Sequence, residues 1–186
     1  MIRFLSSAFF VALILFCGAA RSSPHRLDAE GEVREAIDRA FGQLRSGDYA
    51  ALYDGLPAAS QRRISKARFT SSLSKTRGMY DLQRMEVGRI AVSSGDQVAV
   101  ADTVIYAQVQ RPFTTEGKIA VQQYLVRENG KWRVATGDRT TSQRLLAKHP
   151  DFARRYPSRE PRVYIKRDGR WVELGSIADL RQRLGI

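Results

Sequence analysis

The chain has 186 residues, a formal net charge of +12, 43% hydrophobic residues, one cysteine and two histidines. This composition allows one globular domain with additional segments, and it excludes a disordered chain, a multi-pass membrane protein and a disulfide scaffold. So few cysteines and histidines also leave zinc, copper and iron without their usual ligands, so we expect no metal site.

The first twenty residues have the features of an export signal. A basic residue precedes an apolar run over 4–20, and the run ends in the small residues Gly18 and Ala20. These features are typical of a signal peptide that is removed after export. We therefore expect 1–20 to be a signal peptide, 21–28 to be a mobile linker, and the protein to be periplasmic or secreted. The alternative is an uncleaved membrane anchor, since about 17 apolar residues can span a bilayer.

Three helices are predicted after this leader. Apolar residues recur every three or four positions over 29–45, which predicts an amphipathic helix. Asp48 is placed to cap a second, shorter helix. A third helix is expected to begin near Ser60 or Ser65 and to end at Gly78.

Strands follow, because the hydrophobic period changes from 3.6 to 2 after the third helix. The alternation slips in phase at Gly88, which predicts a β-bulge and a bent sheet. Further strands are predicted over 97–110, 118–128 and 131–136, with a tight hairpin turn at 129–130. Since helices and strands are segregated along the chain, the fold class is α+β with an antiparallel sheet.

Two short motifs and their order carry a family resemblance. The segment Gly-Asp-Tyr-x-x-Leu-Tyr at 47–53 precedes a serine-rich helix and the bulged sheet, and Asn-Gly-Lys-Trp-Arg-Val follows at 129–134. Together they resemble the NTF2-like superfamily over 29–138, and most of all the non-catalytic NTF2-like domain of some penicillin-binding proteins and small exported NTF2-like domains of unknown function. The resemblance implies three helices packed into a strongly curved sheet that forms a cone. That superfamily also contains enzymes, so the fold leaves the function open.

The remaining segment, 139–186, forms a basic extension. It is expected to contain a short helix over 140–148, a connector over 150–157, a hairpin over 162–174 and a capped helix over 176–184. We expect this extension to pack on the cone or to extend its sheet.

The extension also concentrates positive charge. It holds 12 basic and 5 acidic residues, against 18 and 14 over 21–138. In an exported protein this charge favours an anionic envelope component or an acidic protein as partner, and a solvated basic face is the alternative. Without a helix-turn-helix, an RNP-type motif or a zinc finger, nucleic acid is not expected as a partner.

Asp102 is the best candidate for a catalytic residue. The resemblance implies that enzymes of this superfamily hold an acid or base inside the cone, and a carboxylate on an apolar face would have a raised pKa. Tyr53, Tyr106 or Tyr124 could then donate a hydrogen bond to a developing oxyanion. We favour the alternative, in which this face is the outer side of the sheet and Asp102 pairs with a basic neighbour.

Aromatic residues offer a second kind of site. Tyr49, Tyr53, Tyr106, Tyr124 and Trp132 could line a pocket for a hydrophobic ligand, although as core aromatics they need none. No phosphate loop, nucleophile motif or paired-cysteine motif is present, so no cofactor is expected.

The predicted function is therefore a non-enzymatic, exported NTF2-like binding or accessory module of the cell envelope or extracellular space. One alternative is an isomerase or dehydratase that uses Asp102 as its general base. A second is a hydrophobic-ligand-binding protein. Homodimerisation through the open sheet face is compatible with each of them.

Overall fold

The computed structural model describes residues 24–111, 114–135 and 139–176. The predicted signal peptide and residues 177–184 of the predicted last helix therefore lie outside the described residues. Within the described part of the chain, no helix is both long enough and apolar enough to cross a membrane.

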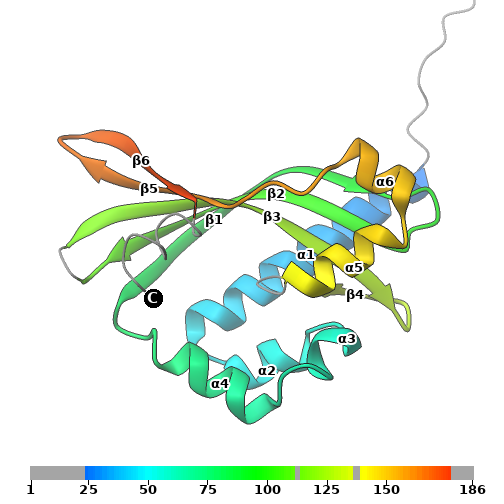
Figure 1. Cartoon of the computed structure of the whole chain (residues 1–186), viewed down its shortest axis with the longest axis horizontal. Helices are drawn as coiled ribbons and strands as arrows, with labels where there is room; N and C mark the ends of the chain where they lie inside the picture. Colours follow the sequence, from blue (N-terminus) through cyan, green and yellow to red (C-terminus); the bar gives the residue numbers. More distant parts are fainter. Residues whose placement is uncertain (1–23, 112–113, 136–138, 177–186) are drawn as a thin grey trace, which may run out of the picture.

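The fold is α+β, as predicted, with helices on both faces of one six-stranded antiparallel sheet (Figure 1). The helices are α1 (Pro24–Ser46), α2 (Tyr49–Asp54), α3 (Ala58–Gln61), α4 (Lys66–Ser74), α5 (Arg139–Ala147) and α6 (Pro150–Arg155). The strands are β1 (Tyr80–Val92), β2 (Val98–Val109), β3 (Thr115–Glu128), β4 (Lys131–Val134), β5 (Arg162–Arg167) and β6 (Arg170–Ser176). They lie in the order β1-β2-β3-β5-β6, and β4 pairs with the C-terminal end of β3.

The predicted first two helices are confirmed. α1 covers the predicted span and extends back to Pro24, where the described residues begin, so residues 24–28 of the predicted linker belong to this helix. Its residues Val33 and Ile37 are fully buried in the core that α1 forms with the sheet. Asp48 caps α2, since its side chain accepts a hydrogen bond of 3.0 Å from the backbone N–H of Ala51.

The predicted third helix is in fact two helices. α3 includes Ser60, and α4 starts after Ser65, whose hydroxyl accepts a hydrogen bond of 3.3 Å from the backbone N–H of Arg68. Both candidate start points therefore belong to helices, and the chain turns between them.

The predicted bulge in β1 is also confirmed. The pairing of β1 with β2 shifts register between Val87 and Ile90, around Gly88, and shifts once more near Gln83. Such bulges bend a strand and increase its twist. The bent sheet carries α1 to α4 on one side, while α6 lies on the other (Figure 1).

The two sides of the sheet have separate cores. We name them the α1 face and the α5 face. On the α1 face, Ala99 and Ala101 of β2 pack with α1; on the α5 face, Val98, Val100 and Tyr124 pack with α5 and α6. Successive residues of β2 thus point into different cores, as the period of a strand requires.

The extension continues the sheet, which was one of the two predicted arrangements. β5 pairs with β3 from Gly117 to Ala120, and β6 pairs with β5. The prediction of a connector over 150–157 was wrong, because α6 occupies most of it. Pro150 stands at the start of α6, where proline supports a helix rather than ending one.

Candidate functional site

A cavity of about 690 Å³ lies between the sheet and the helices of the α1 face. We call it the apolar cavity. Its apolar lining consists of Ile37, Ala40, Phe41, Leu44, Leu52, Leu56, Ile64, Phe69, Leu73, Met85, Ile105 and Val134. Its polar lining consists of Ser60, Arg63, Arg68, Ser72 and Gln123. A hollow of this size and polarity is typical of sites for small hydrophobic molecules.

Helical periodicity builds two walls of the cavity. Phe41 and Leu44 are three residues apart on α1, and Phe69 and Leu73 are four apart on α4, so each pair lies on one face of its helix. The third wall is the sheet, where Met85 of β1 pairs with Ile105 of β2.

The polar groups in the sheet wall bond to one another. Gln123 is only 3% exposed, and its Nε2 donates a hydrogen bond of 3.2 Å to Oγ1 of Thr103. That hydroxyl in turn donates a bond of 2.9 Å to the carbonyl oxygen of Val121. Among the described residues that line the cavity there is no carboxylate, imidazole or thiol. The lining therefore offers no side chain of the kinds that usually act as a general base.

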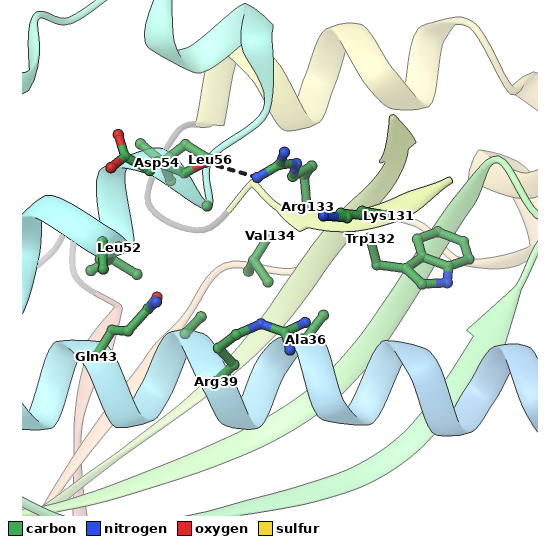
Figure 2. A pocket seen from close by; sticks show the side chains of 13 residues that line it. Ala36, Arg39, Gln43, Leu52, Asp54, Leu56, Lys131, Trp132, Arg133 and Val134 are labelled. Atoms are coloured by element: carbon green, nitrogen blue, oxygen red, sulfur yellow. Dashed lines mark hydrogen bonds between the residues drawn. The ribbon is translucent and has the colours of Figure 1, made fainter. Parts of the chain in front are cut away.

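A second hollow, of about 580 Å³, lies between α1, α2 and β4. We call it the basic hollow. Figure 2 shows Arg39 rising from α1 while Lys131 and Arg133 come from β4. The basic hollow shares four lining residues with the apolar cavity, so the two are neighbours separated by a common wall. That wall consists of Ala40, Leu52, Leu56 and Val134.

The acidic residue of the basic hollow is already bound elsewhere. Both carboxylate oxygens of Asp54 accept hydrogen bonds from Nζ of Lys66, at 2.9 and 2.7 Å. The backbone carbonyl of Asp54 accepts a bond of 2.8 Å from Nη1 of Arg133 (Figure 2). Asp54 thus orients Arg133 through its backbone, while its charge is balanced by Lys66.

The structure places Asp102 on the α5 face, across the sheet from the apolar cavity. Its carboxylate accepts a hydrogen bond from Arg159 and one of 3.3 Å from Gln122, and it lies 3.7 Å from Arg89. The side chain is 36% exposed. This environment is that of a carboxylate paired with basic neighbours.

Two of the predicted aromatic residues also lie on the α5 face. Tyr106 stacks with Arg84, whose guanidinium carbon is 3.6 Å from the ring centre. Its ring also packs edge-on against Trp171, with 6.1 Å between the two ring centroids. Tyr124 is buried, and its hydroxyl donates a hydrogen bond of 2.8 Å to Gln122. Burial raises the pKa of that hydroxyl above the usual value for tyrosine.

The other three predicted aromatic residues lie on the α1 face, but apart from one another. Tyr53 packs on Phe69, and its hydroxyl donates a hydrogen bond of 2.9 Å to the carbonyl of Ile64. Tyr49 lines a separate hollow of about 180 Å³. Trp132 lines the basic hollow, and its Nε1 donates a bond of 3.1 Å to Glu32. The structure therefore does not bring the five predicted aromatic residues into one pocket.

The apolar residues that line the cavity carry only the sequence signal of core residues. The spacing of Phe41, Leu44, Phe69 and Leu73 marks them as inward-facing, and this signal is the same whether the interior is filled or hollow. Arg39, on the polar face of its helix, carried no sequence signal for a site.

No group of three or more histidine, cysteine or acidic side chains is arranged for a metal ion within the described residues. A scan against protein-family models finds no match, and a comparison with curated proteins finds no significant similarity.

Proposed function

We propose that this protein is a ligand-binding module that holds a small hydrophobic molecule in the apolar cavity without transforming it. The observation that carries the proposal is a cavity of about 690 Å³ with a mainly apolar lining, in which twelve of the seventeen lining residues are apolar. Apolar surface gains free energy when a ligand removes it from water, by about 25 cal/mol per Å². The lack of an acid or base among the described lining residues favours binding over catalysis.

The proposal includes an NTF2-like identity and an exported location. The order of motifs at 47–53 and 129–134 supports the first, and the apolar run over 4–20 supports the second. We further propose that 139–186 contacts an anionic envelope component. Part of its charge is already balanced within the chain, because Arg159 pairs with Asp102 and Lys166 pairs with Glu116 at 2.7 Å.

An isomerase or dehydratase that uses Asp102 is less well supported. A general base must come within hydrogen-bond distance of the proton that it removes. Asp102 lies on the opposite face of the sheet from the apolar cavity, and basic side chains already engage its carboxylate. A substrate in the cavity would be separated from this carboxylate by the sheet.

Titration with N-phenyl-1-naphthylamine, a neutral dye that fluoresces in apolar surroundings, tests the proposal. The wild-type protein is expected to bind the dye saturably with one site. Met85→Trp should weaken this binding at least about tenfold, because a larger side chain at this position fills part of the cavity.

Met79→Trp is the matched control, because Met79 is 47% exposed and does not line the cavity. This variant should bind the dye as the wild type does. Dye binding that is absent from the wild type, or that both substitutions alter equally, would refute a binding role for the apolar cavity.

A further inference from the structure

The basic hollow has the chemistry of a binding site of its own. We propose that it is a second ligand site, distinct from the apolar cavity, and that it binds the carboxylate or phosphate group of a small organic anion. The proposal does not depend on the function of the apolar cavity, because the occupant is recognised by charge.

The first argument is the excess of positive charge. Arg39, Lys131 and Arg133 all line the hollow, and Asp54 is its one acidic lining residue in the described part of the chain. Since Lys66 holds the carboxylate of Asp54, that negative charge does not neutralise the three cations. Among the described residues, no carboxylate lies within ion-pair distance of Arg39, Lys131 or Arg133. Three cations that line one concave surface, two of them (Arg39 and Lys131) with exposed side chains, attract an anion.

The second argument is the hydrogen bonding of Arg133. Its Nη1 donates to the backbone of Asp54, but its Nε is buried and has no acceptor among the described residues. A buried donor without an acceptor costs about 1–3 kcal/mol. The planar guanidinium group presents its donors as a fork that matches the two oxygens of a carboxylate or phosphate. The Nε atom itself is closed off from solvent, so an oxyanion in the hollow would be bound by the Nη donors of the same guanidinium group.

The third argument concerns the rest of the ligand. Trp132 and the aliphatic side chains of Leu52, Leu56 and Val134 also line the hollow, beside the cations (Figure 2). An inorganic ion would leave these apolar groups uncovered. A small molecule with an acidic group and an apolar body fits both kinds of lining.

Isothermal titration calorimetry with phenyl phosphate, benzoate and phenol tests this proposal. Phenyl phosphate, benzoate or both should bind the wild-type protein at one site, and the stronger of the two identifies the preferred acidic group. Phenol, which has the same ring and no charge at neutral pH, should bind at least about tenfold more weakly. The double substitution Arg39→Gln and Lys131→Gln should weaken anion binding at least about tenfold.

The matched control is the double substitution Arg62→Gln and Arg144→Gln. It removes the same amount of charge from two exposed positions outside the hollow, and it should leave the affinity within about twofold of wild type. The fluorescence of Trp132 shows whether the anion binds in the basic hollow. In the Trp171→Phe variant Trp132 is the only tryptophan, so its fluorescence should change when the anion binds beside it. The proposal is overturned if neither anion binds, if phenol binds equally well, or if both double variants lose the same affinity.

Discussion

Asp102 shows how a single residue type can suggest two roles. It shares one strand face with Val100 and Tyr106, and in sequence that setting suits either a catalytic carboxylate or a surface ion pair. The deciding partner, Arg159, is 57 residues away along the chain. No local pattern connects two positions so far apart. The local sequence around Asp102 therefore does not reveal its ion-pair partner.

Asp102→Asn tests the role of this residue. The substitution removes the charge that pairs with Arg159, and the side chain is 36% exposed, so solvent screens the loss. We expect the free energy of unfolding to fall by less than about 1 kcal/mol in urea denaturation. Affinity for the neutral dye should be unchanged. A tenfold loss of dye affinity in a folded variant would connect Asp102 to the apolar cavity and restore the enzyme hypothesis.

At the level of elements, local signals predicted most of the fold. The amphipathic spacing of α1, the Asp48 cap and the slip in phase at Gly88 each depend on a few neighbouring residues, and each was confirmed. The hairpin turns were also predicted correctly, with positive φ at Asn129 and Asp168 and at the glycine after each. β3 begins at Thr115, three residues before the predicted start, because the end of β2 continues to pair with it.

Which face of β2 receives α1 could not be predicted. Val98 and Val100 on one face, and Ala99 and Ala101 on the other, are all buried. Both alternating sets are apolar because the sheet is covered on both sides, by α1 on one and by α5 and α6 on the other. The position of the cavity relative to Asp102 was undetermined for the same reason.

Gly117 provides a test of how closely β3 packs against β2, at the end of β3 that also pairs with β5. A Cβ atom at this position would lie 3.0 Å from Cγ2 of Val109 and 3.6 Å from the carbonyl oxygen of Tyr164. The contact with Val109 of β2 is tighter than ordinary van der Waals contact, whereas the contact with β5 is an ordinary one, so a side chain at this position would press on β2. Gly117→Val should lower the free energy of unfolding by about 1–3 kcal/mol in urea denaturation.

Gly95→Val is the control for this experiment. Gly95 lies in the exposed turn before β2, and the nearest contact of a Cβ atom there is an ordinary one of 3.9 Å with Gln97. It should change stability by less than about 0.5 kcal/mol. Equal losses in the two variants would contradict tight packing between β2 and β3 at Gly117.

At the scale of the whole molecule, the predicted α+β class is confirmed, whereas the apolar cavity could not be predicted. The hollow depends on how far α1 and α4 stand from the bent sheet, and this separation is set by many contacts at once. Phe41 and Leu73 have the spacing of ordinary core residues. The sequence does not tell whether side chains from the helices touch those of the sheet and fill the interior, or leave a cavity between them. The NTF2-like cone and the exported location remain predictions.

The central claim is that the interior between α1, α4 and the sheet is open to a hydrophobic ligand. The chain has three methionines, Met1, Met79 and Met85, which makes ¹³C-methyl labelling of methionine a simple local probe. Met85 lines the apolar cavity, whereas Met79 is exposed and lies outside it.

NMR titration of the methionine-labelled protein with 1-dodecanol tests this claim most directly. The account predicts that the methyl resonance of Met85 shifts progressively and saturates at one equivalent of bound ligand, while that of Met79 stays in place. A Met85 resonance that does not move, or one that moves no more than that of Met79, would contradict it.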